Sequence, residues 1–197
     1  MPAHDQVLFT GFPGFIGERL LPRLLERRAG SVFVCVVQPR FADAAARSVA
    51  EIEARHPHTR QRIRLAMGDI TLPDLGLPDV GAILPSLTAA YHLAAAYDLA
   101  VSREVGLRVN VEGTRNVLRL LARAPRLQRL HYVSTAYVSG TTTGVFRETD
   151  LDVGQKFKNF YEETKFLAEA LVVESGLPAT VYRPAIVVGD SRTGETG

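Results

Sequence analysis

A stretch near the N-terminus, from Val7 to Gly17, constrains the fold more than any other part of the chain. A short apolar run ends at Thr10, three glycines follow at three-residue spacing, and an apolar pattern of helical period begins after them. A strand, a glycine turn and a helix in this order are typical of a site for a dinucleotide pyrophosphate, because the helix N-terminus offers unpaired N–H groups and the positive end of its dipole. The residues that we predict to contact a cofactor here are Thr10, Gly11, Phe12, Pro13, Gly14, Phe15, Ile16 and Gly17.

Each glycine of this turn has its own expected role. Gly11 lets the chain turn sharply off the strand, Gly14 leaves no Cβ where the phosphates approach, and Gly17 lets the helix pack closely on the sheet. The spacing is G-x-x-G-x-x-G rather than the commoner G-x-G-x-x-G, so a plain glycine-rich turn is the alternative interpretation of this stretch taken alone.

Composition excludes several classes of protein. The 197 residues suit one domain, and 46% hydrophobic with 22% charged residues is typical of a globular chain. The formal net charge of +2 argues against a dedicated nucleic-acid surface. We expect no membrane span, because no apolar run is long enough, and no signal peptide is evident.

Cysteine and histidine usage argues against disulfides and metals. The single cysteine, Cys35, lies in an apolar run, so we expect a buried thiol and a reducing, cytoplasmic location. His56 and His58 have no third ligand nearby in the sequence, so we expect a solvent-exposed loop there and no metal site.

Apolar runs and helical patterns alternate along the whole chain. This alternation predicts the α/β class, with a Rossmann-type doubly wound parallel sheet, and a single NAD(P)-binding domain over residues 1–197. A long loop is expected over 139–160, and loops of that length are often functional. The predicted strands are 7–10, 31–37, 62–67, 89–93, 130–134 and 179–183, and the predicted helices are 15–28, 42–54, 101–122 and 161–174.

Tyr161 and Lys165 are the second informative feature. Four residues apart on a helix, they lie on the same face one turn apart. A free phenol has a pKa of about 10, and we expect the lysine ammonium to lower it towards the working range of a proton donor or acceptor. A chance pair on a surface helix is the alternative. Ser134 and Thr135 close the fifth predicted strand, where either hydroxyl can stabilise an oxyanion or simply bond the local backbone.

Taken together in chain order, these motifs resemble the extended form of the short-chain dehydrogenase/reductase superfamily. The resemblance extends over nearly the whole chain. The segments that carry it are Thr10-Gly11-x-x-Gly14-x-x-Gly17, Gly68-Asp69-Ile70, His92-Leu93-Ala94-Ala95, Asn110-Val111-x-Gly113-Thr114, Val133-Ser134-Thr135, Tyr161-x-x-x-Lys165 and Arg183-Pro184.

The resemblance implies a role for each matching residue. It implies that Asp69 and Ile70 flank the adenine, and that Thr135, Tyr161 and Lys165 are catalytic. Thr135 is preferred to Ser134 because it lies three residues before Val138, as the catalytic hydroxyl of the superfamily does. The remaining implied residues are Asn110, which supports the catalytic group; Ala94, Ala95 and Ala96, which line the cofactor path; and Pro184, Ile186 and Val187, which contact the nicotinamide.

Three further segments are similar to one branch, the fatty acyl-CoA reductases and carrier-protein thioester reductases, also called male-sterility domains. They are Ser134 to Val138, Phe157 to Lys165 and Arg183 to Gly194. This branch uses NADPH to reduce an acyl thioester, bound to coenzyme A or to a carrier protein, to an aldehyde or an alcohol. Nucleotide-sugar epimerases or dehydratases, ketone reductases and a non-catalytic NADP-binding protein are the alternatives.

The end of the second predicted strand favours NADP over NAD. An NAD-selective fold usually has an acidic residue there to hold the ribose hydroxyls. This chain instead has Val37-Gln38-Pro39-Arg40, in which Arg40 can bind a 2′-phosphate. An ordinary surface charge is the alternative for Arg40.

Relatives of the extended type continue past the position of Gly197 into a smaller substrate domain. The resemblance therefore implies that this chain lacks the C-terminal substrate domain and its acyl pocket. We expect cofactor binding to be retained and thioester reduction to be weak. An exposed sheet edge and uncovered apolar surface are expected to favour association into a homo-oligomer.

Overall fold

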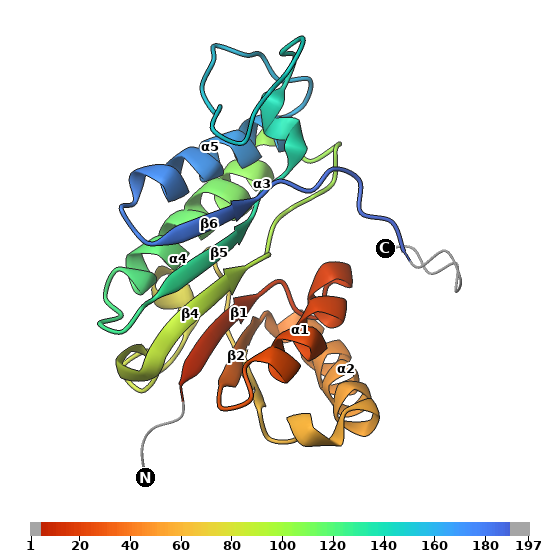
Figure 1. Ribbon diagram of the computed structural model, residues 1–197, viewed down its shortest axis with the longest axis vertical. Coiled ribbons are helices and arrows are strands. Elements are labelled where there is room, and N and C mark those ends of the chain that lie inside the picture. The colour runs from red at the N-terminus through yellow and green to blue at the C-terminus, as the bar shows by residue number, and fades with distance from the viewer. Residues whose placement is uncertain (1–4, 190–197) are drawn as a thin grey trace.

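The computed structural model describes residues 5–189, in which six parallel strands form one sheet with helices on both faces (Figure 1). The strand order is β3-β2-β1-β4-β5-β6, so the chain builds one half outward from β1 and then returns to the other side of β1 to build the second half. The predicted Rossmann-type doubly wound parallel sheet is confirmed. The strands are β1 (Gln6–Thr10), β2 (Val32–Val37), β3 (Ile63–Met67), β4 (Leu87–His92), β5 (Arg129–Val133) and β6 (Ala179–Tyr182). The helices are α1 (Phe15–Arg27), α2 (Ala42–Arg55), α3 (Arg103–Gly106), α4 (Gly113–Leu121) and α5 (Phe160–Glu174).

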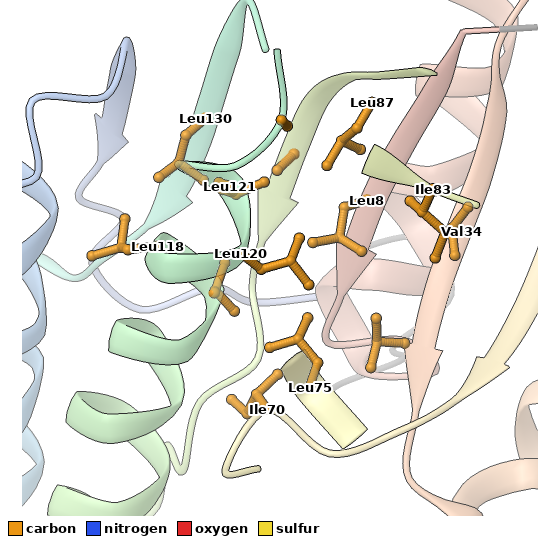
Figure 2. Packing of buried hydrophobic residues seen from close by; sticks show 14 of the residues in the cluster. Leu8, Val34, Ile70, Leu75, Ile83, Leu87, Leu118, Leu120, Leu121 and Leu130 are labelled. Atoms are coloured by element: carbon orange, nitrogen blue, oxygen red, sulfur yellow. The ribbon is translucent and has the colours of Figure 1, made fainter. Parts of the chain in front are cut away.

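Two apolar cores, one on each face of the sheet, hold the layers together. Helices α1 and α2 lie on one side of the sheet, and α4 and α5 lie on the other (Figure 1). In β1, Val7 and Phe9 pack towards α1 and α2, whereas Leu8 packs into the cluster on the opposite face. Figure 2 shows that second cluster, where Leu8 of the sheet lies towards Leu120 of α4 and Val34 lies beside Ile83. Because both faces are covered, the central strands β1 and β2 carry apolar runs, Val7 to Phe9 and Val32 to Val37, as a buried parallel sheet requires.

Cys35 lies in the core between the sheet and helices α1 and α2. It is fully buried, and burial raises the pKa of its thiol, so the group is a packed apolar side chain without thiolate character. This placement confirms the predicted buried thiol.

The helical region predicted for 101–122 is regular only in part. Between α3 and α4 the structure forms a π-helical turn over Leu107–Glu112, so the backbone there takes a wider turn than an α-helix. Hydrophobic periodicity shows which face of a helix is buried, but it does not detect one turn of altered width. The turn contains Asn110, one of the predicted site residues.

The switch point of the sheet lies between β1 and β4. In open α/β sheets, ligands bind beyond the carboxyl ends of the strands at such a point. The glycine turn follows β1, the segment after β4 begins at Leu93, and the expected long loop links β5 to α5 at the same end of the sheet (Figure 1). The fold therefore brings the motifs predicted from sequence to one end of the sheet.

Candidate active site

The glycine turn between β1 and α1 is built so tightly that side chains are excluded from it. Gly11 has a φ of +89°, and a Cβ on it would lie 2.8 Å from the backbone nitrogen of Ala94. A Cβ on Gly17 would lie 2.5 Å from the Gly11 carbonyl oxygen, so this glycine allows α1 to close onto the turn. Gly14 is the N-cap of α1 and provides no side-chain cap, so the first N–H groups of the helix are not capped by a side chain. These features fit a bound pyrophosphate.

The other residues of the turn divide between the core and the surface. Phe12 is buried with the core under α1 and α2, and Thr10 is buried at the end of β1. Phe15 and Ile16 begin α1 and are partly exposed, as is Pro13.

The structure links Arg40 and Asp69 through a residue that the sequence analysis did not select. The Gln38 side chain donates from Nε2 to Asp69 Oδ2 over 2.8 Å and accepts at Oε1 from Arg40 Nε over 2.8 Å. The Arg40 guanidinium also lies over the Phe41 ring, 4.6 Å from its centroid, at the exposed end of β2. Gln38 therefore orients the Arg40 guanidinium. Its position directly after β2 is the sequence signal that could have identified it as a site residue. Ile70, by contrast, is buried in the core on the α4 side, against the Cα of Gly113.

Asn110 ties the segment after β4 to helix α5. Its Oδ1 accepts from the backbone N–H of Ala96 over 2.7 Å, and its Nδ2 donates to the Ala96 carbonyl over 3.1 Å and to Thr164 Oγ1 over 3.0 Å. Ala94 is held by its own N–H bond to Thr10 Oγ1, at 3.2 Å. The stretch from Ala94 to Ala96, including Ala95, is therefore fixed beside the glycine turn.

A buried histidine lies at the centre of the sheet. His92 Nδ1 is 2.7 Å from Thr10 Oγ1, and His92 Nε2 is 3.0 Å from Thr114 Oγ1. Burial and the charge of Lys165 lower the pKa of His92 to about 3, so the imidazole is neutral at physiological pH. The sequence analysis quoted His92 as part of a motif but gave it no role.

His92 predicts a specific loss of stability in acid. Its pKa lies near 6.5 in the unfolded chain and at about 3 when folded, so only the unfolded state takes up a proton as the pH falls below 6.5. The contribution of neutral His92 to the free energy of unfolding is complete above pH 6.5. It declines between pH 6.5 and pH 3 by roughly 1.4 kcal/mol per pH unit. We expect urea unfolding at pH 7 and pH 5 to show a smaller pH effect in His92→Gln than in the native chain. The exposed His58→Gln is the control, and an equal pH effect in all three proteins would contradict this assignment.

Helix α5 begins with a capping arrangement that sets the position of Tyr161. Asn159 Oδ1 accepts from the Glu162 N–H over 2.9 Å, and the Glu162 carboxylate accepts in return from the Lys158 N–H over 2.9 Å. This reciprocal cap fixes where the helix starts. Tyr161 is consequently in the first turn, half-buried, with Lys165 one turn further along and only 3% exposed.

The two neighbouring hydroxyls at the end of β5 have different partners. Ser134 donates to the buried carboxylate of Glu169, which in turn pairs with Arg183. The Thr135 hydroxyl is hydrogen-bonded with Tyr161, and it also accepts from the Tyr137 N–H over 3.2 Å. Thr135 is therefore the hydroxyl that lies with the tyrosine, and Ser134 belongs to an ion-pair cluster.

The prediction that Lys165 lowers the pKa of Tyr161 is wrong for this chain by itself. The Lys165 ammonium donates to Tyr132 Oη over 2.9 Å and to the Val133 carbonyl over 2.8 Å. Burial raises the pKa of Tyr161, and the hydrogen bond from Thr135 offsets this only in part. The sequence placed the two residues on one helix face, but the strand beneath provides nearer acceptors for the ammonium.

A cavity of about 760 Å³ opens at the end of β5. Its walls include Ile16 of the glycine turn, Val133, and Pro184 and Val187 from the segment after β6. The Pro184 carbonyl accepts from the Ala136 N–H over 2.9 Å, which places that segment directly against the end of β5. Ile186 is 75% exposed. The cavity therefore connects the start of α1 with the end of β5, where Thr135 follows.

Residues 5–189 contain no candidate membrane-spanning helix and no candidate metal centre. No helix among them is both long and apolar enough to cross a membrane. No group of three or more potential metal ligands gathers in that part of the chain.

The sheet order, the glycine turn and the group of Thr135, Tyr161 and Lys165 define an NAD(P)-binding Rossmann domain of the short-chain dehydrogenase/reductase type. A family model described as Male sterility protein matches residues 9–197, and the chain belongs to that family.

Relatives and solved structures agree with this assignment. An isonitrile lipopeptide synthase of Streptomyces coeruleorubidus is 34% identical over 96% of this chain, and the fatty acyl-CoA reductase wat of Drosophila melanogaster is 28% identical over 97%. The crystal structure of the terminal R domain from the myxalamid PKS-NRPS pathway superposes with a TM-score of 0.79 at 31% identity over the whole chain. This chain spans 14% of the first relative, 44% of the second and 52% of the solved domain.

Proposed function

We propose that this chain binds NADPH and takes part in reducing an acyl thioester, held on coenzyme A or a carrier protein, to an aldehyde. NADPH, when bound, supplies the hydride. The observation that supports this most is the cavity between the glycine-turn helix and the end of β5, which is lined by Val133 and Ala136, the residues on either side of Ser134 and Thr135. The single buried cysteine fits a reducing compartment, and we propose a cytoplasmic location.

The proposed chemistry assigns each polar group a task. As hydride adds to the thioester carbon, the carbonyl oxygen gains negative charge, which the Thr135 and Tyr161 hydroxyls stabilise by donating hydrogen bonds. Tyr161 then supplies a proton, and the resulting hemithioacetal collapses by breaking its C–S bond, releasing the thiol and the aldehyde. The net change is one thioester, one NADPH and one proton to one aldehyde, one thiol and one NADP⁺.

A raised pKa suits Tyr161 to this direction of reaction. Reduction needs a proton donor, and a phenol whose pKa lies above its usual value of 10 is fully protonated at neutral pH. The neutral phenol is the form that stabilises an oxyanion, because it can donate a hydrogen bond to it.

The test of the proposed function follows NADPH oxidation with several substrate classes. We expect loss of NADPH absorbance and formation of free thiol with acyl-CoA or an acyl-pantetheine thioester. A nucleotide sugar and a simple ketone are the comparison substrates. Turnover of either without turnover of any thioester would contradict the proposal in favour of an epimerase or a ketone reductase.

Arg40 is proposed to select NADPH by contacting the 2′-phosphate. We expect Arg40→Ala to weaken NADPH binding by about 10–100-fold, the range for losing a charge-assisted hydrogen bond, and to leave NADH binding unchanged. Calorimetric titration with both cofactors measures this. The exposed Arg60→Ala is the control, and equal weakening of both cofactors would contradict a role in selecting the phosphate.

A further inference from the structure

A row of polar side chains crosses the sheet beneath the candidate active site. The strand register pairs Thr10 of β1 with His92 of β4, and His92 with Tyr132 of β5. All three are buried, with at most 1% of each residue exposed. The positions lie at the carboxyl ends of their strands, where a parallel sheet otherwise carries apolar residues. A polar row in this place needs a reason, because burying polar groups is costly unless all of them are paired.

Hydrogen bonds join this row into one network that ends at Lys165. Thr10 contacts His92 over 2.7 Å, His92 contacts Thr114 over 3.0 Å, and Thr114 is hydrogen-bonded with Tyr132. Tyr132 Oη then accepts from the Lys165 ammonium over 2.9 Å, and the ammonium also lies 4.5 Å from the centre of the Tyr132 ring. The other end is fixed as well, because Thr10 accepts the N–H of Ala94.

This hydrogen-bond network gives the Tyr132 hydroxyl a defined orientation. Burial raises the pKa of the Tyr132 phenol, so the group keeps its proton, and its side-chain hydrogen bond with Thr114 ties the oxygen to the buried polar row. The same oxygen accepts a hydrogen bond from the Lys165 ammonium. The Val133 carbonyl accepts a hydrogen bond from a second N–H of the ammonium, which leaves the third N–H for another partner.

We propose that Tyr132 is a positioning residue whose hydroxyl, oriented by Thr114 and His92, holds the Lys165 ammonium in place beneath the cofactor site. The proposal rests on the proposed function only in that we also assign Lys165 to the binding of NADPH. The hydrogen-bond network itself is a property of the protein alone.

The charged and titratable groups around Lys165 determine what removal of the hydroxyl does. Glu169, one turn further along α5, favours the ammonium, and burial opposes it, so that the pKa of Lys165 is lowered to about 7. His92 of β4 is neutral, Tyr161 is a neutral phenol on the same helix, and Arg183 is paired with Glu169. Loss of the Tyr132 acceptor therefore makes the ammonium less favourable, and Lys165 should lose its proton at a lower pH.

The decisive experiment is an NMR titration of lysine labelled with ¹³C at Cε. The chain has three lysines, Lys156, Lys158 and Lys165, of which the first two are exposed loop residues that serve as internal references. In Tyr132→Phe we expect the midpoint of the Lys165 titration to move down by about one pH unit, since a hydrogen bond to a charged group is lost. Thr114→Val should move it in the same direction, because the Tyr132 hydroxyl is then free to turn.

Tyr91→Phe on the neighbouring strand β4 is the matched control. Tyr91 loses the same atom but packs in the opposite core, against Phe9 and Phe33, and should leave the midpoint unchanged. An unchanged midpoint in both Tyr132→Phe and Thr114→Val, or an equal change in Tyr91→Phe, would overturn the proposal. Thr114→Val keeps the test available if Tyr132→Phe does not fold.

Catalytic turnover separates this proposal from the proposed function. If the midpoint moves as expected and no form of the protein oxidises NADPH with a thioester, the positioning role of Tyr132 stands and the thioester reductase assignment fails. If thioesters are reduced but the midpoint does not move, the thioester reductase assignment stands and the positioning role of Tyr132 fails.

Discussion

Replacing Tyr161 by phenylalanine should lower thioester turnover by about 10²–10⁴-fold while leaving NADPH affinity within about twofold of the native value. The ring is half-buried at the start of α5 and is retained in the variant, so the change removes only the hydroxyl that is bonded with Thr135. The measurement is kcat with a saturating acyl thioester, together with a fluorescence titration of NADPH.

Tyr137 is the informative control because its phenol also lies close enough to raise the pKa of Tyr161. We expect Tyr137→Phe to keep turnover within about threefold. The opposite pattern, with Tyr161→Phe active and Tyr137→Phe inactive, would move the proton donor to Tyr137. Loss of NADPH binding in Tyr161→Phe would show instead that the hydroxyl is needed for cofactor binding.

Replacing Glu169 by alanine should lower the free energy of unfolding by about 3–5 kcal/mol, the usual cost of removing one partner of a buried ion pair. Glu169 is 1% exposed, and it accepts from Ser134 as well as from Arg183 Nε, the latter over 2.9 Å. Alanine would leave the Arg183 guanidinium partly buried without its carboxylate. Urea unfolding at pH 7 measures the effect.

The same change should loosen the loop between β5 and α5. Arg183 also donates to the carbonyl of Arg147 over 3.1 Å and to that of Asp150 over 2.8 Å, so the ion pair anchors the loop beside the cavity. We expect limited proteolysis to cut this loop faster in Glu169→Ala.

Glu163→Ala on the same helix is the matched control for both measurements. Glu163 pairs with Arg103 at the surface, over 2.9 Å, and exposed pairs contribute little to stability. Equal stability losses in Glu169→Ala and Glu163→Ala would contradict the anchoring role.

The sequence was sufficient for the fold and for the location of the site. The apolar run before Thr10, the glycines after it and the alternation of strand and helix patterns are local signals, each set by backbone geometry within about twenty residues. They predicted a parallel doubly wound sheet, and the structure has one. Tyr161 and Lys165 were placed on one helix face by the same kind of local rule.

Only the tertiary structure decided which groups those side chains contact. Lys165 bonds Tyr132, which lies 33 positions earlier, and Thr10 bonds His92, which lies 82 positions later. These contacts depend on the register between parallel strands, which is set by packing across the whole sheet and leaves no periodic signal in the sequence. For the same reason the sequence could not separate Ser134, bonded to Glu169, from Thr135, beside Tyr161, except by resemblance. The strand and helix pattern determined where the polar groups meet, and the packing of the sheet determined how they pair.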